Sequence, residues 1–320
     1  MSVFLFILIN NIIPIFALIA LGYFLTKKFD LNIHTLTKLN FYAFLPCFTF
    51  VSLYTTKIPL EMTKVLMAVI FLMVMNIFVV KLVAKACDYS EGMKNAFSNC
   101  VLFYNTGNIG IPLVTLVFSS QPFVINGETP YLNIALTAQI MVLVVQNITT
   151  NTFGFLNAGR ATTHWKECIY KVLKMPTIYA IPLAFLLKAI PYDMTQLPIW
   201  PALEYARDAL VSIALITLGV QLSRTAFELK NKDVYLATVI RLVIGPLLAL
   251  LIIYLFHMEG IIAQVIMISS ALPTGVNVAL IAVEYDNFPD FSSQTVMFTT
   301  LSSAVSLAGV IYIARIFFPI

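Results

Sequence analysis

Long apolar runs separated by short polar connections set the pattern of this chain. A membrane-spanning helix needs about 20 apolar residues, whereas a membrane β-barrel shows alternating segments of about ten. The runs here are long and continuous, so they predict membrane-spanning helices. Ten segments qualify, approximately residues 3–25, 36–54, 60–83, 93–118, 131–155, 172–190, 202–222, 234–256, 261–285 and 293–317.

Two of these segments contain polar, helix-breaking residues at their centres. The fourth contains Asn105-Thr106-Gly107-Asn108-Ile109-Gly110-Ile111-Pro112, and the ninth contains Pro273-Thr274-Gly275-Val276-Asn277. Proline lacks an N–H and its ring opposes the preceding helical turn, while glycine permits unwinding and close approach. We therefore expect both helices to break inside the membrane.

Composition supports a membrane protein and excludes a soluble globular domain. Hydrophobic residues make up 60% of the 320 residues and charged residues 11%, whereas soluble domains carry about 25% charged residues. Mean hydropathy is +0.92. The net charge of +4 is spread over the connections, so we expect no nucleic-acid partner. Residues 3–24 lack the charged start and cleavage site of a signal peptide and are expected to be a retained span.

Lysine and arginine placement predicts the orientation of the bundle. If the N-terminus is outside, 14 of the 19 basic residues fall at inward ends, because cytoplasmic connections collect Lys and Arg. The other five are Lys57, Lys64, Lys188, Arg207 and Arg315. The bias predicts an integral protein of the plasma (inner) membrane with both termini outside and a cytoplasmic central connection at residues 157–171.

The two halves, residues 1–156 and 172–320, are expected to form an inverted repeat. Each half has five predicted spans, and an odd number gives the halves opposite orientations. Two short matches support this: Pro14 and Pro182 lie in similar tripeptides, and Thr106-Gly107 matches Thr274-Gly275. Both pairs are 168 positions apart.

Paired interruptions in corresponding halves point to a transporter's binding site. Helix N-termini freed by a break carry positive partial charge and attract anions. We expect Asn108 to be the N-cap after the first break and Thr274 to cap after the second. A structural kink with satisfied polar groups is the alternative. The predicted substrate-binding residues are Asn105, Thr106, Gly107, Asn108, Gly110, Pro112, Pro273, Thr274, Gly275 and Asn277.

Other polar residues in the spans are expected mainly to join helices by hydrogen bonds. Asn10, Gln139 and Gln146 are also candidates for supporting the site. Asp208 is a candidate for binding a coupling ion, with pairing to Arg207 as the favoured alternative. Arg241 is expected to extend to the cytoplasmic interface. We expect no metal site and no cofactor, because the histidines and cysteines show no ligand spacing.

The residues around both interruptions resemble the auxin efflux carrier family, particularly its prokaryotic members, often named malonate or malate transporters. Gly107 to Pro112 and Ala271 to Asn277, followed by Glu284-Tyr285, carry the resemblance. It implies a five-plus-five fold like that of bile acid/sodium symporters, with crossing helices at Asn108, Gly110, Pro112, Pro273 and Asn277. It also implies a homodimer whose scaffold (spans 1, 2, 6 and 7) supports a mobile transport unit (spans 3–5 and 8–10).

The resemblance further implies a secondary transporter that moves small organic anions by an elevator-like motion. The chain lacks the long central loop of the plant exporters, which argues against auxin as the substrate. The coupling ion (H⁺, Na⁺ or none) and the direction of transport stay open at this point. A non-transporting ligand sensor or scaffold and a channel are the alternative functions, and nothing in the spans has the residue pattern of an enzyme.

Overall fold

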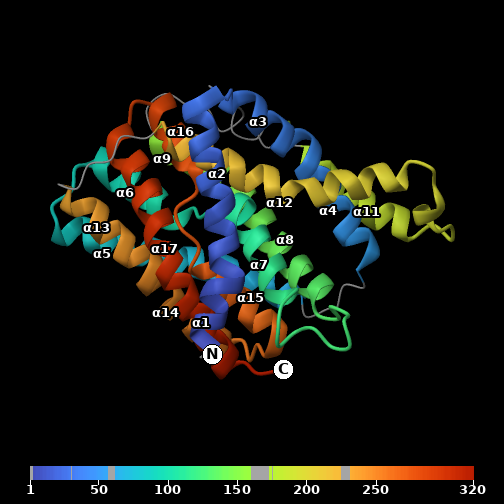
Figure 1. The fold of residues 1–320 in the computed structure, drawn as a ribbon. Helices are drawn as coiled ribbons and strands as arrows, with labels where there is room; N and C mark the ends of the chain where they lie inside the picture. Colours follow the sequence, from blue (N-terminus) through green and yellow to red (C-terminus); the bar gives the residue numbers. More distant parts are fainter. Residues whose placement is uncertain (1–2, 30, 57–61, 160–172, 175, 225–230) are drawn as a thin grey trace.

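The computed structural model describes residues 3–29, 31–56, 62–159, 173–174, 176–224 and 231–320, and this part of the chain is built of helices joined by turns and loops (Figure 1). It contains no β-strand within those residues, only two isolated bridges. Most of the predicted central connection, residues 160–171, lies outside the described residues.

The first half of the chain begins with a long helix that contains one widened π-helical turn, and the same feature recurs in later helices. The elements are α1 (Val3–Ile7), η1 (Leu8–Ile12), α2 (Ile13–Phe29), α3 (Ile33–Leu39), η2 (Asn40–Phe44), α4 (Leu45–Thr55), α5 (Met62–Ala86), α6 (Glu91–Leu102), η3 (Thr106–Gly110), α7 (Ile111–Phe118), α8 (Leu132–Thr149), η4 (Thr150–Gly154) and α9 (Phe155–Ala158).

The second half has a similar succession of helices, again with a break between two short ones. Its elements are α11 (Pro176–Lys188), η5 (Met194–Gln196), α12 (Trp200–Leu222), α13 (Lys232–Val239), η6 (Ile240–Ile244), α14 (Gly245–Leu255), α15 (Gly260–Ser270), α16 (Val276–Glu284) and α17 (Pro289–Phe317).

Each of the ten predicted segments contains helix, and six helical stretches are both long and apolar enough to cross a membrane. These six are Phe4–Phe29, Thr35–Thr55, Met62–Ala86, Leu132–Ala158, Lys232–Leu255 and Pro289–Phe317. Three shorter apolar helices, Thr106–Phe118, Pro176–Lys188 and Gly260–Ser270, accompany them. The described chain is therefore built as a helical membrane protein.

Several prolines in these helices are accommodated by π-helical turns, whereas Pro182 lies inside α11 without one. A proline removes one N–H and its ring crowds the carbonyl of the preceding turn, which a locally widened turn relieves. Four π-helical turns end two residues before a proline, namely η1 before Pro14, η2 before Pro46, η3 before Pro112 and η6 before Pro246. The helices consequently continue past these prolines.

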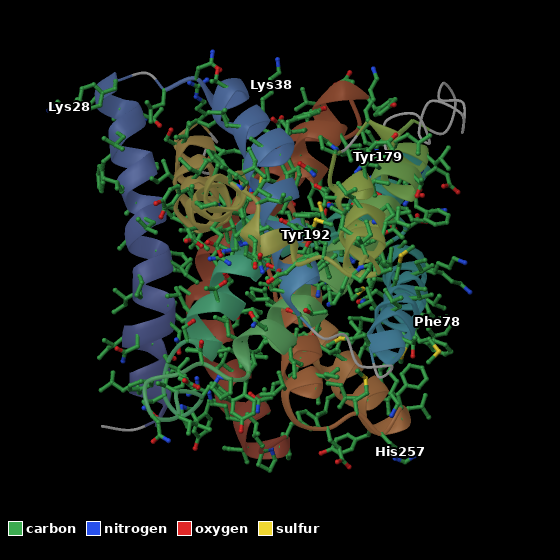
Figure 2. The ribbon with its side chains drawn as sticks, turned by 90° about the vertical axis from the view of Figure 1, so that its right-hand side faces the viewer. Lys28, Lys38, Phe78, Tyr179, Tyr192 and His257 are labelled. Carbon is green, nitrogen blue, oxygen red and sulfur yellow. The ribbon has the colours of Figure 1, made fainter. Side chains whose placement is uncertain are left out.

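Two groups of helices form the bundle. In the first, α2 packs along α12 and α4 packs along α11. In the second, α5, α8, α14, α15 and α17 pack around the short helices α6, α7, α13 and α16. Figure 2 shows Lys28 and Lys38 at the opposite end of the molecule from His257, and in Figure 1 both chain ends lie at the His257 end.

Candidate functional site

The two helix breaks lie against each other. The backbone N–H of Asn105 donates to the Pro273 carbonyl (2.8 Å), and the N–H of Gly275 donates to the Phe103 carbonyl (2.9 Å). Tyr104 and Thr274 thus form an isolated antiparallel bridge between segments 170 positions apart. Backbone N–H and C=O groups that a helix break frees inside a bilayer must find protein or water partners. Here the two breaks provide such partners for each other through these two hydrogen bonds.

Asn105, rather than Asn108, caps the helix after the first break. The Asn105 side chain accepts a hydrogen bond from the Asn108 N–H (3.1 Å), so the helix begins at Thr106, one turn earlier than predicted. The prediction for Asn108 is therefore wrong. The Asn108 side-chain oxygen instead accepts from the amide of Asn40 in η2 (3.0 Å), which links the break to the first group of helices.

The second break ends without a side-chain cap. Gly275 is the N-cap residue of α16 and makes no side-chain cap, and no hydrogen bond from another side chain in the described residues is found at this helix start. The prediction that Thr274 caps α16 is wrong, because the Thr274 hydroxyl donates to the carbonyl of Cys100 in α6 (2.8 Å). Its fully buried side chain thereby joins the two breaks. The Val278 N–H donates to the Gly275 carbonyl (3.0 Å), so the N–H groups of Val276 and Asn277 are the ones left to a ligand.

Two glutamines on α8 hold the first break in place. Gln146 accepts from the Tyr104 N–H (3.2 Å) and donates to the Leu102 carbonyl (3.4 Å). Gln139 donates to the Thr106 carbonyl (3.1 Å) and accepts from the hydroxyl of Ser269 in α15. Both glutamines are buried, and their contacts are with backbone and a neighbouring helix.

Arg241 in η6 is completely buried, so the prediction that it extends to the interface is wrong. Its guanidinium donates to the carbonyls of Val101 (2.7 Å) and Ser270 and lies 4.6 Å from the centre of the Tyr104 ring. Val101 is in the last turn of α6, and Ser270 is the last residue of α15. Helix C-termini carry negative partial charge, so one cation neutralises the C-terminal ends of both broken helices.

A polar cavity of 40 Å³ lies at the breaks. Six predicted substrate-binding residues line it: Asn105, Thr106, Gly107, Asn108, Gly275 and Asn277. Gln146, which was expected to support the site, lines it as well. Asn105 is 5% exposed, and its side-chain nitrogen has no hydrogen-bond partner among the described residues. The cavity therefore combines an unpaired amide donor with the uncapped N-terminus of α16, and both favour an anionic guest.

The other four predicted substrate-binding residues do not line this cavity. Gly110 packs where a Cβ atom would overlap the Gln139 side chain, and Pro112 is in the first turn of α7. Pro273 contributes its carbonyl to the bridge, and Thr274 binds α6. These four residues contribute to the conformation and packing of the breaks, and neighbouring residues line the cavity.

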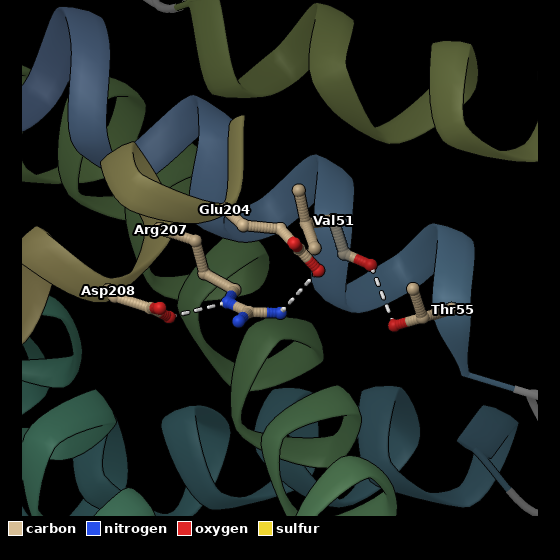
Figure 3. Close-up of polar contacts among 5 residues, drawn as sticks. All are labelled: Val51, Thr55, Glu204, Arg207 and Asp208. Carbon is tan, nitrogen blue, oxygen red and sulfur yellow. Dashed lines mark hydrogen bonds and ion pairs between the residues drawn. The ribbon is translucent and has the colours of Figure 1, made fainter. Parts of the chain in front are cut away.

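Asp208 and Asn10 lie away from the breaks. The Asp208 side chain is 63% exposed and accepts a hydrogen bond from Arg207 (2.8 Å), which also pairs with Glu204, as Figure 3 shows. Asn10 is exposed and donates to the Phe6 carbonyl of its own helix (2.9 Å). Neither residue lines the polar cavity.

A second cavity of 270 Å³ adjoins the first, and the two share Phe41, Asn147 and Asn277. Tyr42, Leu45, Leu280 and Ile281 make much of its lining apolar, and Lys38 is on its rim. The pair of cavities is thus polar at the breaks and apolar toward the end of the molecule that carries Lys38.

Comparison with known proteins places the sequence in a family. The family model described as "Membrane transport protein" matches two stretches, residues 7–166 and 160–311, which together cover nearly the whole chain. The chain belongs to the membrane transport protein family. This family includes the auxin efflux carriers, so the resemblance noted at the two interruptions is confirmed.

Individual relatives within the membrane transport protein family carry transporter names. An "Uncharacterized transporter" from Methanothermobacter thermautotrophicus is 23% identical over 93% of this chain and 95% of its own length. A "Putative malonate transporter" from Rhizobium meliloti is 28% identical over 37% of this chain and 38% of its own. "Auxin efflux carrier component 1" from Arabidopsis thaliana is 26% identical over 43% of this chain and 22% of its own.

Proposed function

We propose that this membrane transport protein is a secondary transporter that binds a small organic carboxylate at the paired breaks. The observation that carries the proposal is the convergence of two donor sets on one cavity. The uncapped N-terminus of α16 supplies backbone N–H groups, and Asn105 supplies an unpaired amide. A carboxylate is an acceptor with two oxygens and a negative charge, so it complements both.

The charge arrangement around the breaks favours the same guest. Arg241 compensates the negative ends of α6 and α15 on one side, which leaves the positive N-terminal ends of η3 and α16 facing the cavity. Such helix ends bind anions through backbone N–H groups without a charged side chain in the site. Asn277, which also lines the cavity, adds a neutral amide.

The two cavities suggest how the anion lies. The polar cavity of 40 Å³ has room for a carboxylate-sized group, and the apolar cavity of 270 Å³ begins beside it. A carboxylate with a short apolar body would put its charge at the breaks and its carbon chain beside Phe41 and Leu45. The malonate and auxin transporters among the relatives are named for organic acids, which is in keeping with this class.

Alternating access by an elevator-like motion is the proposed mechanism. In an inverted repeat, α2 would correspond to α11, and α4 to α12. If each helix of the observed pair α2–α12 is replaced by its counterpart, the result is the other observed pair, α4–α11. The observed pairs α7–α8 and α16–α17 are related in the same way, with α16 as the counterpart of α7 and α17 as the counterpart of α8. We assign the first group of helices as the scaffold of a homodimer and the second as the unit that moves.

In this mechanism the substrate stays at the breaks while the moving unit carries them past the scaffold. The hydrogen bond between Asn40 and Asn108 joins the two groups beside the cavity. If both termini are outside, the apolar cavity opens toward the cytoplasm. The membrane potential then supplies about 2.3 kcal/mol per charge per 100 mV for anion export.

A ligand screen followed by a flux assay tests the proposal. The purified protein is screened by thermal shift against C2–C6 carboxylates, amino acids and indole acids, with and without sodium and at two pH values. A carboxylate that stabilises the protein is then tested for uptake into proteoliposomes. We expect saturable flux, whereas binding without flux would indicate a sensor, and non-saturating flux with unitary currents would indicate a channel.

A further inference from the structure

A third hollow lies in the moving unit, away from the proposed substrate site. It measures 530 Å³ and runs between α5, α6 and the helix formed by α8, η4 and α9. None of the residues that line it also lines the polar cavity at the breaks. We call this hollow the lateral groove.

The polarity of the lateral groove changes along its length. One end is lined by Lys81, Lys94, Asn95 and Asn157, near the connection between α5 and α6. The other end is lined by Ile70, Met73 and Val74, which are earlier in α5. A charged, hydrogen-bonding end and an apolar end within one groove match a molecule with an anionic head and a hydrocarbon tail.

The two lysines differ in how far they are already neutralised. Lys94 pairs with Glu91 (2.7 Å), whose side chain is 69% exposed, so this pair lies at the surface. Lys81 is exposed and makes no ion pair with any residue that the structure describes. The groove therefore keeps an uncompensated positive charge at its polar end.

The length of the groove suits one leaflet of a bilayer. From Lys81 back to Ile70, α5 rises by about 16 Å at 1.5 Å per residue. The hydrocarbon core of a bilayer is roughly 30 Å thick, so one leaflet is about half of that. Val74, which lines the groove, and Phe78, one turn further along α5, are 58% and 62% exposed. Phe78 lies at the surface of the molecule (Figure 2).

We propose that the lateral groove binds an anionic phospholipid from the leaflet on the lysine-rich side of the protein. Lys81 and Lys94 hold the phosphate, Asn95 and Asn157 border the head group, and one acyl chain lies along α5 toward Ile70. Basic pockets between membrane helices recognise anionic head groups by this combination of charge and apolar depth. The site needs only that the chain is embedded in a membrane, and it is independent of the transported substrate.

Native mass spectrometry of the full chain in detergent tests this site. The protein is titrated with phosphatidylglycerol, with phosphatidylcholine and with glycerol phosphate, which has no acyl chains. We expect phosphatidylglycerol to bind most tightly. Lys81→Gln and Lys94→Gln should each weaken its binding about fivefold, which corresponds to about 1 kcal/mol per basic side chain. Lys28→Gln is the matched control, because Lys28 is exposed and lies across the molecule from α5 (Figure 2).

A second variant tests the apolar half of the groove. Val74→Trp enlarges a side chain that already faces outward, and it should weaken both phospholipids together. Equal affinity for the two phospholipids, or unchanged binding in Lys81→Gln, would overturn the proposal. If glycerol phosphate bound as tightly as phosphatidylglycerol, the acyl chains would contribute nothing to binding, and the proposal of a phospholipid site would be overturned. Loss of a dimer in Val74→Trp would identify a second copy as the occupant, which also overturns it.

Discussion

The guanidinium of Arg241 lies over the ring of Tyr104, 4.6 Å from its centre, in a fully buried position where two helices end. Tyr104 is in the bridge that joins the two breaks. Arg241 binds the carbonyls of Val101 and Ser270 on either side. One side chain thus stabilises the bridge and both C-terminal ends at once, which makes it the structural centre of the paired breaks.

Replacing Arg241 by Gln should strongly destabilise the protein. The change leaves two buried carbonyls without a charged donor, and hydrogen bonds to a charged group contribute about 1.5–3 kcal/mol each. We expect a loss of at least about 3 kcal/mol, measured as a lower unfolding temperature in detergent. Arg207→Gln is the control, since the ion pairs of Arg207 with Glu204 and Asp208 are at the surface, where such pairs contribute about 0–1 kcal/mol. Equal stability of the two variants would contradict this role.

The close packing of α2 on α12 gives a second prediction. A Cβ atom on Gly22 would overlap the Ile216 carbonyl, and one on Gly219 would overlap the Ile19 carbonyl. Gly22→Ala and Gly219→Ala should therefore each destabilise the protein by about 1–3 kcal/mol, the usual cost of overpacking. Thermal unfolding in detergent measures this loss.

Gly309 in α17 is the matched control for these glycines, because a Cβ atom there meets nothing within 4 Å. Gly309→Ala should be neutral or stabilise its helix by up to about 1 kcal/mol, owing to the higher helix propensity of alanine. If Gly22→Ala behaved like Gly309→Ala, the two helices would have room to separate, and the packing argument would fail.

The positions of the breaks were predictable from the sequence, whereas their internal bonding was not. Proline and glycine disfavour a regular helix, and they predicted the interruptions at residues 105–112 and 273–277. The first break itself lies at residues 103–105, and the helix that follows continues past Pro112. Asn105 and Asn108 are both good capping residues, and only the geometry of the turn selects Asn105. Pro14, Pro46 and Pro246 show the converse, because π-helical turns absorb these prolines without a break.

The prediction that Arg241 extends to the cytoplasmic interface was wrong because it treated a cation near the end of a span as a surface group. Its actual partners are the ends of two helices that are remote in sequence, Val101 and Ser270. The sequence signal was an arginine several residues inside an apolar segment, followed closely by Pro246. Intramembrane cations of this kind usually have a structural or functional partner, which the sequence alone does not identify.

Alkaline pH should reveal a hydrogen bond that Tyr89, in the connection between α5 and α6, donates to Asp233 in the first turn of α13 (2.6 Å). Burial, followed by the hydrogen bond to Asp233 and its charge, raises the pKa of Tyr89 above its usual value. The unfolded chain therefore loses the phenolic proton first, and this contribution to stability, full below pH of about 10, declines as the pH rises further.

Tyr89→Phe removes this group and should make the free energy of unfolding less dependent on pH above about 10. Chemical unfolding in detergent at several alkaline pH values measures the dependence. Tyr205→Phe is the control, since Tyr205 is 77% exposed. An unchanged pH dependence in Tyr89→Phe would show that Tyr89 titrates alike in the folded and unfolded chain.

Asn105→Asp separates the two roles of Asn105. The new carboxylate keeps the oxygen that caps the Asn108 N–H but replaces the unpaired amide donor by a negative charge at the polar cavity. We expect folding to survive and carboxylate binding to fall at least tenfold in thermal-shift titrations, with flux lost in proteoliposomes. Asn32→Asp makes the same change at the N-cap of α3, outside both cavities, and should leave binding intact. Normal carboxylate binding by folded Asn105→Asp would place the anion elsewhere, because a carboxylate there would repel it.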